Sequence, residues 1–206
     1  PRRRQGGVSM RIISAEFQVS APDLNSCPRW GLPEFALIGR SNVGKSSLIN
    51  VLTERRALAM VSDTPGKTKL LNFFVINAKW SLVDLPGYGY ANVAKSQRAD
   101  FNEATADFLA GRKNLRRIFV LIDSRLPPQA IDLEFLRWLD TGHVPFALIF
   151  TKTDKQSAAK GQVNVELFKK AMIGLRSEMP EIILSSARTG SGRTEILGSI
   201  ERAMKT

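Results

Sequence analysis

The sequence is poor in cysteine and has no long apolar run. Its 206 residues include a single cysteine, Cys27, so the chain cannot form an internal disulfide or a zinc cluster built from several thiolates. A lone thiol suits a reducing compartment, and we interpret Cys27 as a partly buried, unreactive side chain. No stretch of about 18 or more uncharged apolar residues occurs, which argues against a membrane span and for a soluble protein.

Internal repeats and long low-complexity linkers are lacking as well. The length suits one α/β domain with a full hydrophobic core. We expect an N-terminal arm over residues 1–33, with a short strand within RIISAEFQV, and one globular domain over residues 34–206.

Acidic residues are outnumbered: 30 Lys and Arg against 19 Asp and Glu give a net charge of +11. This excess favours a polyanionic partner such as RNA or a ribosome; a basic but merely solvated surface is the alternative. The basic residues cluster in PRRRQGG at the start, in GRKNLRR at 111–117, and at Lys169 and Lys170. No aromatic-rich platform accompanies them, so we expect contacts with phosphate backbone or RNA shape.

The same basic start leaves two compartments open. The first 15 residues carry no acid, which is also typical of the end of an organellar transit peptide. We therefore expect a soluble intracellular protein, either of the bacterial cytoplasm or of a plastid or mitochondrial interior.

Short apolar runs alternate with amphipathic segments. This pattern predicts an α/β fold with a mostly parallel, six-stranded central sheet and helices on both faces. The predicted strands are EFALIG, LLNFFVIN, WSLVD, RIFVLID, PFALIFT and EIILSS, with a tight turn at Ala78 and Lys79. The predicted helices cover about residues 45–52, 96–110, 129–139, 163–177 and 194–204. In such sheets ligands bind outside the carboxyl ends of the strands.

The strongest motif is GRSNVGKS, residues 39–46, between a predicted strand and a predicted helix. Gly39 and Gly44 let successive backbone N–H groups point at an anion, and the helix adds its positive N-terminal end. The Lys45 side chain can reach the β- and γ-phosphates, and the Ser46 hydroxyl can ligate Mg²⁺. We therefore predict a nucleotide-binding phosphate loop.

The identity of the base depends on two further motifs. TKTD, residues 151–154, ends a predicted strand, and the Asp154 carboxylate can accept two hydrogen bonds that guanine offers and adenine does not. Lys152 would lay its apolar stem along the base. SSA, residues 185–187, places the Ala187 N–H near the guanine carbonyl. Guanine is therefore predicted, and an ATP-dependent kinase is disfavoured.

A switch is predicted from two loops. Asp84 in DLPG follows a strand and can hold Mg²⁺ through water, while the Gly87 N–H can reach the γ-phosphate. Thr68 in TPGKTKLLNFF can close over Mg²⁺ when the γ-phosphate is present, with Thr64 as the alternative. The predicted catalytic residues are Lys45, Thr68 and Gly87, and the predicted metal ligands are Ser46, Thr68 and, through water, Asp84.

The order of GRSNVGKSSLIN, TPGKTKLLNFF, LVDLPGYGYA, TKTD and SSA resembles the EngB family of translation-factor-related GTPases, from about Glu34 to the C-terminus. The resemblance implies a P-loop GTPase domain that binds GTP or GDP with Mg²⁺ and helps to assemble the large ribosomal subunit; we also expect a monomer with no membrane partner. The nucleotide contacts it implies are Gly39, Arg40, Ser41, Asn42, Val43, Gly44, Lys45, Ser46, Ser47, Gly66, Lys67, Thr68, Lys69, Leu70, Asp84, Leu85, Pro86, Gly87, Thr151, Lys152, Thr153, Asp154, Ser185, Ser186 and Ala187.

Four positions leave alternatives open. Tyr88 stands where Ras-type GTPases carry the glutamine that orients water, so we expect slow intrinsic hydrolysis. Tyr88 and Tyr90 either face a partner or pack against a helix. Asn42 is either a K⁺ ligand, as in similar GTPases, or a turn residue. Thr151 replaces the more common asparagine, which leaves that amide's contact with the phosphate loop in question.

The function itself has one alternative from another class. A nucleotide-gated scaffold could dock on RNA in its GTP state while its hydrolysis is incidental. Hydrolysis-dead variants that retain GTP binding separate this scaffold from a GTPase whose turnover is required.

Overall fold

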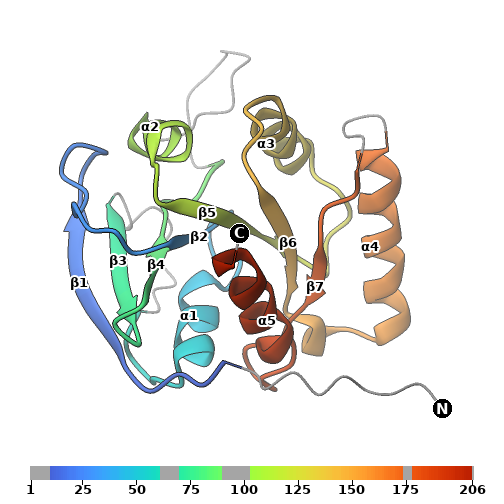
Figure 1. Cartoon of the computed structure of the whole chain (residues 1–206). Helices are drawn as coiled ribbons and strands as arrows, with labels where there is room; N and C mark the ends of the chain where they lie inside the picture. The colour runs from blue at the N-terminus through green and yellow to red at the C-terminus, as the bar shows by residue number, and fades with distance from the viewer. Residues whose placement is uncertain (1–9, 61–69, 90–102, 174–177, 206) are drawn as a thin grey trace.

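A computed structural model describes residues 10–60, 70–89, 103–173 and 178–205, and the structural statements below concern these residues (Figure 1). They form one seven-stranded sheet in the order β1-β3-β4-β2-β5-β6-β7. The strands are β1 (Ala15–Ala21), β2 (Glu34–Gly39), β3 (Leu71–Ile76), β4 (Trp80–Asp84), β5 (Leu115–Asp123), β6 (Phe146–Thr151) and β7 (Ile182–Leu184). The helices are α1 (Lys45–Thr53), α2 (Glu103–Gly111), α3 (Ala130–Thr141), the 3₁₀ turn η1 (Thr153–Lys155), α4 (Ala158–Met172) and α5 (Arg193–Met204).

The direction of the strands decides where the motifs meet. Strands β4, β2, β5, β6 and β7 pair in parallel, while β3 is antiparallel to both β1 and β4. Parallel neighbours place their carboxyl ends at one edge of a sheet. The register puts Leu37 opposite Asp84 and Asp123 opposite Thr151, so four strands end close together.

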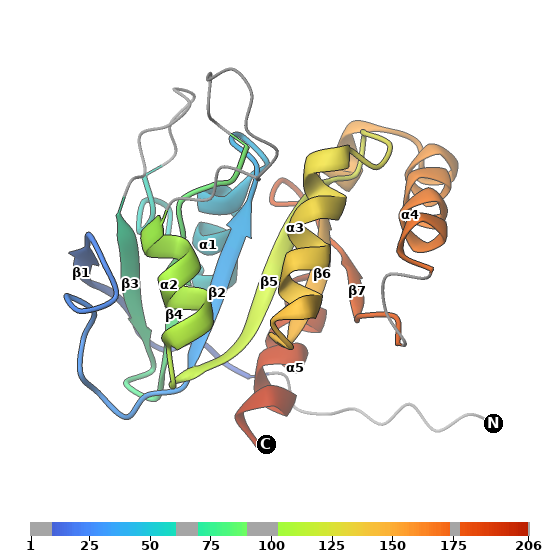
Figure 2. The same cartoon turned by 90° about the horizontal axis from the view of Figure 1, so that it is seen from above.

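Helices cover both faces of the sheet (Figures 1 and 2). On one face, α1 and α5 bury side chains such as Leu48 and Ile196 against β2, β5 and β6. On the other face, α2, α3 and α4 contribute Phe108, Phe135 and Phe168 to a second cluster. Burial on both faces explains why β2 and β6 are buried at every position and carry runs of apolar residues rather than an alternating pattern. None of the helices in these ranges has the length and apolar character needed to cross a membrane.

Some predicted boundaries were wrong. Helix α4 begins at Ala158 rather than near residue 163, because the Ser157 side chain caps it by accepting a hydrogen bond from the Lys160 N–H at 3.3 Å. The hairpin turn covers Asn77 as well as the predicted Ala78 and Lys79, and both Asn77 and Ala78 have φ of 53°. The predicted end of α4 beyond residue 173, and the predicted start of α2 before residue 103, lie outside the described residues.

The seventh strand comes from the N-terminal arm. Strand β1 pairs with β3 from Ala15 opposite Ile76 to Ala21 opposite Leu71, so the sheet has one strand more than the six predicted. The arm joins the sheet at Glu34, the first residue of β2, whose side chain is fully buried. Its carboxylate accepts hydrogen bonds from Arg112 at 2.6 and 2.8 Å and from the Trp30 indole at 2.7 Å. These partners make burial of the charge tolerable.

Candidate functional site

The predicted phosphate loop connects β2 to α1 at the carboxyl edge. Asn42 and Gly44 have φ of 59° and 104°, a backbone course that turns neighbouring N–H groups toward one side. A Cβ at Gly39 would lie 2.7 Å from the Leu121 carbonyl oxygen, so only glycine fits there. Ser46 lies in the first turn of α1, beside the end of the helix that favours anions. The local geometry therefore suits phosphate.

Lys45 and Asp84 contact each other at this end of the site. The Lys45 Nζ lies 2.9 Å from the Asp84 Oδ1, and the two side chains are only 13% and 6% exposed. Burial raises the pKa of Asp84, and the Lys45 ammonium opposes that shift. The Lys45 ammonium is the ion-pair partner of Oδ1, and this oxygen accepts no other hydrogen bond among the described residues. Both groups are therefore poised for new partners.

The residues at this position fit a magnesium site that phosphates complete. The Asp84 carboxylate offers a buried oxygen, Oδ1, that the Lys45 ammonium contacts, and the Ser46 hydroxyl belongs to the adjacent helix turn. In the described ranges, no group of three or more His, Cys, Asp or Glu side chains is placed to hold a metal. Mg²⁺ at nucleotide sites takes one or two protein oxygens plus waters and phosphates, so a larger cluster is not required. Thr68, its alternative Thr64, and Gly66, Lys67 and Lys69 lie outside the described residues.

The two base-recognition motifs meet as predicted from their order. The Ser186 hydroxyl donates to the Asp154 Oδ1 at 2.7 Å, which lowers the pKa of Asp154. The other carboxylate oxygen, Oδ2, is buried without a hydrogen-bond partner in the described part of the chain. A cavity of about 240 Å³ lies here, lined by Gly44, Ser47, Lys152, Asp154, Ser185 and Ala187 among others. Asp154 thus presents a charged acceptor at a cavity next to the phosphate loop.

Thr151 and Lys152 attach this cavity to the phosphate loop. The Thr151 hydroxyl donates to the Val43 carbonyl at 2.6 Å, and the Lys152 ammonium donates to the Asn42 carbonyl at 2.6 Å. The threonine therefore reaches the loop itself, although it lacks the amide of the more common asparagine. Lys152 is also among the residues that line the cavity, and the place of its apolar stem along a base stays a prediction.

Sequence reasoning missed Asp123, the last residue of β5. Its Oδ2 pairs with Lys152 at 2.9 Å and with Arg125 at 2.7 Å. Burial raises the pKa of Asp123, but the hydrogen bonds from Arg125 and Lys152 outweigh it and bring the pKa to about 2. The sequence did indicate this position, because Asp123 ends the apolar predicted strand RIFVLID and so lies at the same edge of the sheet as the motifs.

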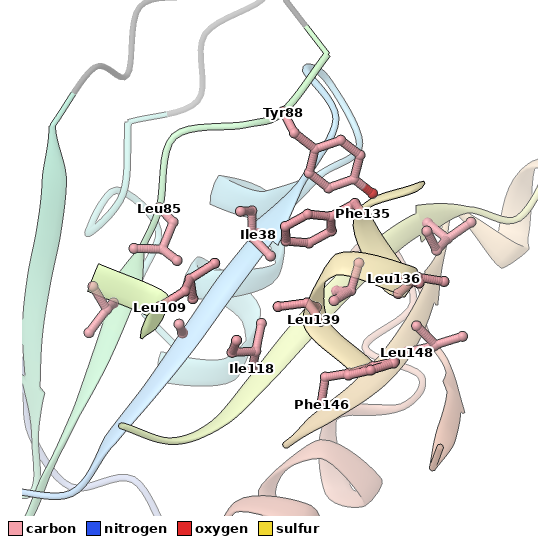
Figure 3. Packing of buried hydrophobic residues seen from close by; sticks show 14 of the residues in the cluster. Ile38, Leu85, Tyr88, Leu109, Ile118, Phe135, Leu136, Leu139, Phe146 and Leu148 are labelled. Atoms are coloured by element: carbon pink, nitrogen blue, oxygen red, sulfur yellow. The ribbon is translucent and has the colours of Figure 1, made fainter. Parts of the chain in front are cut away.

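The loop after β4 lies against the phosphate loop. Leu85 is buried, and a Cβ at Gly87 would come within 2.7 Å of the Gly39 carbonyl oxygen. Tyr88 takes the packing alternative: its ring is 2% exposed and contacts α3 (Figure 3). Its partner Asp132 was not predicted, and Tyr90 lies outside the described residues.

Four further predicted contact residues belong to the described part of the chain. Arg40 and Ser41 line a second, smaller cavity of about 130 Å³ on the α3 side of the loop. Thr153 donates its hydroxyl to the Ser185 carbonyl at 3.1 Å, which joins the two base motifs. Leu70 is exposed immediately before β3.

Comparison with known proteins places this site in a family context. The family described as 50S ribosome-binding GTPase matches residues 34–152. The probable GTP-binding protein EngB of Phocaeicola vulgatus is 50% identical over 199 residues, covering 95% of this chain and 100% of that protein. The probable GTP-binding protein EngB of Bacteroides thetaiotaomicron is 48% identical over 196 residues, covering 95% of this chain and 97% of that protein.

Solved structures share the fold at lower identity. The crystal structure of a probable GTP-binding protein EngB has a TM-score of 0.63 at 21% identity, covering 84% of this chain and 98% of that one. The G domain of the T. maritima FeoB iron transporter has a TM-score of 0.57 at 24% identity, covering 84% of this chain and 99% of that one. These likenesses confirm the predicted P-loop GTPase fold.

Proposed function

The chain belongs to the EngB family of GTPases, and on that basis we propose that it is a guanine-nucleotide switch acting in assembly of the large ribosomal subunit. The observation that carries the proposal is the match of residues 34–152 to a family described as 50S ribosome-binding GTPase. The relatives named above are bacterial, so we infer the bacterial cytoplasm rather than an organelle as its location.

The Lys45–Asp84 pair supports a switch driven by nucleotide exchange. On GTP binding, the Lys45 ammonium would leave the carboxylate for the β- and γ-phosphates, and the Asp84 carboxylate would then be free to hold Mg²⁺ through water. Bound Mg²⁺ would be held by Ser46 and Thr68 directly and by Asp84 through water, and it would supply positive charge to the phosphates. The Gly87 N–H contacts the γ-phosphate, which GDP lacks. The loop that begins at Asp84 therefore distinguishes the two nucleotides.

We expect slow hydrolysis because the residue after Gly87 is Tyr88, which has no side-chain amide to orient water. The Tyr88 hydroxyl donates its hydrogen bond to Asp132 and is not available to orient water at the phosphate. Asn42 remains a proposed K⁺ ligand, supported by its exposed place in the phosphate loop. Turnover that is faster in KCl than in NaCl at equal ionic strength would support K⁺; equal turnover would leave Asn42 a turn residue.

The distribution of basic side chains supports an RNA partner. Within the run at 111–117, Arg112 is bound to buried Glu34, and Arg117 donates to Glu181 and Ser199, each at 2.7 Å. Lys113 and Arg116 are exposed and have no ion-pair partner among the described residues. Such free cations suit contacts with phosphate backbone.

The test is co-sedimentation of the protein with purified large ribosomal subunits in GTPγS and in GDP, over a salt series. We expect association to be stronger with GTPγS and to weaken steeply with salt, since phosphate contacts release counterions. Equal association with both nucleotides contradicts a switch. A variant that binds GTP but does not hydrolyse it, and that still completes subunit assembly, favours the scaffold over a required GTPase.

A further inference from the structure

Tyr88 follows Gly87 directly and is turned into the protein. Its hydroxyl donates to the Asp132 Oδ1 at 2.9 Å, and its ring stacks on Phe135 with centroids 4.5 Å apart at 30° (Figure 3). Both partners belong to α3, on the opposite side of the loop from β4. A buried tyrosine held at its ring and at its hydroxyl has one defined orientation, and the backbone that carries it is held as well.

The backbone around Tyr88 is held on the other side by the phosphate loop. Tyr88 forms an isolated parallel bridge with Arg40, and Gly87 lies so close to the Gly39 carbonyl that a Cβ would sit 2.7 Å from it. Gly89 has φ of 81°, and a Cβ there would lie 2.6 Å from the Ile131 Cδ1 of α3. The segment is therefore confined between the phosphate loop and α3.

The partner of the Tyr88 hydroxyl, Asp132, is a buried acid with a positive charge, Arg40, nearby. Asp132 is 3% exposed. Burial raises the pKa of Asp132, while the Tyr88 hydrogen bond and the Arg40 charge oppose the shift. A cavity of about 130 Å³, lined by Arg40, Leu126 and Asp132 among others, borders the first turn of α3 beside this contact.

We propose that Tyr88 is a positioning residue, and that its seat on α3, formed by Asp132 and Phe135, holds the Gly87 N–H at the γ-phosphate and thereby couples the GTP state to α3. This inference rests on the γ-phosphate contact of Gly87 in the proposed function. Because GDP has no γ-phosphate, the seat stabilises GTP binding selectively. In this family member the position after Gly87 serves to place the backbone and not to orient water.

The test compares the affinities of the magnesium-loaded protein for GTPγS and GDP in five variants. We expect Y88F and D132A each to weaken GTPγS binding about 5- to 10-fold while changing GDP binding less than about 2-fold, the size of one lost hydrogen bond. D132N should retain the wild-type affinity ratio, because the asparagine Oδ1 accepts the same hydrogen bond. The Y88F/D132A double variant should be no worse than D132A alone. E134A, which removes an exposed carboxylate from the same helix, should change nothing.

Two outcomes overturn the proposal, and a sixth variant separates its failure from that of the proposed function. If Y88F and D132A lose affinity equally for GTPγS and GDP and also melt at lower temperatures, Tyr88 has a role in folding only. Additive losses in the double variant would show that Tyr88 and Asp132 act separately. If G87A changes the GTPγS to GDP ratio but Y88F and D132A do not, the γ-phosphate contact stands and the seat is wrong. If G87A leaves the ratio unchanged while its GDP affinity matches the wild type, so that the added Cβ has not disturbed the phosphate loop at Gly39, the γ-phosphate contact itself is wrong.

Discussion

At the base end of the site, Asp154 is already held by Ser186 at 2.7 Å, whereas at the phosphate end Lys45 and Asp84 are held by each other at 2.9 Å. The base end needs no exchange of partners to receive guanine. The phosphate end must break one contact before it can form others. Groups that are already in position bind a ligand selectively with little loss of conformational entropy. Groups that must first break a contact bind well only a ligand that replaces that contact, so they distinguish one ligand from another. In the proposed function, selection of the base and sensing of the third phosphate therefore lie at different places along the carboxyl edge of the sheet.

The largest expected effect tests the base end. Replacing Asp154 with asparagine should weaken GTP binding about 100-fold or more, since two hydrogen bonds to a charged acceptor are lost at roughly 1.5 kcal/mol or more each. The asparagine amide should in turn accept xanthosine nucleotides, whose carbonyl replaces the guanine amine. Titration with GDP and with xanthosine diphosphate measures both changes.

The control for this prediction is the phosphate end. Affinity for inorganic pyrophosphate with Mg²⁺ should not change in D154N, because Asp154 does not contact the phosphates. Parallel losses of pyrophosphate and GDP binding would mean that the two ends are not independent, and the comparison above would fail.

An intermediate effect is expected at the joint between the two ends. Replacing Thr151 with valine removes the donor to the buried Val43 carbonyl, which costs about 1–2 kcal/mol and should weaken binding of GDP and GTPγS alike by about 5- to 30-fold. Replacing Thr151 with asparagine offers a new donor and should recover much of that loss. A T151V protein with unchanged affinity for both nucleotides would show that the joint does not organise the site.

The smallest effect concerns pH and Asp123. Its pKa of about 2 lies below the ordinary value of 3.8, so its paired carboxylate stabilises the fold above pH 4 and that contribution is lost as the pH falls toward 2. D123N should therefore melt a few degrees below the wild type at pH 7, and the gap should narrow as the pH approaches 3. A gap that stays constant between pH 7 and pH 3 would show that the charge of Asp123 is not what stabilises this position.

The sequence alone located the phosphate loop, Asp84, Asp154 and Ser186, because each occupies a local pattern at the end of an apolar strand. Parallel strands then bring such ends together whatever their separation along the chain. The partners of Tyr88 and Lys152 were not predicted. Asp132 is 44 residues from Tyr88 and Asp123 is 29 from Lys152, and neither belongs to a local motif. Contacts of this kind follow from packing of α3 and β5, which periodicity does not specify.

Boundaries failed for a related reason. The first turns of α4, AAKGQ, are polar or small and carry no apolar periodicity, so only the cap at Ser157 marks where the helix begins. The arm strand was similarly underestimated, since one short run gives no hint of the β3 edge with which it pairs.

Strand β1 also bears on self-association of the protein. It covers the outer edge of β3, whose LNFFVI sequence is the kind of apolar strand that templates pairing between molecules. As the new edge, β1 is a poor template, because its register shifts between Phe17 and Val19 and Glu16 projects a charge. A fragment trimmed to residues 34–206 would keep every predicted nucleotide contact yet bare that β3 edge to other molecules. We therefore expect the fragment without the arm to self-associate but to retain GTP binding.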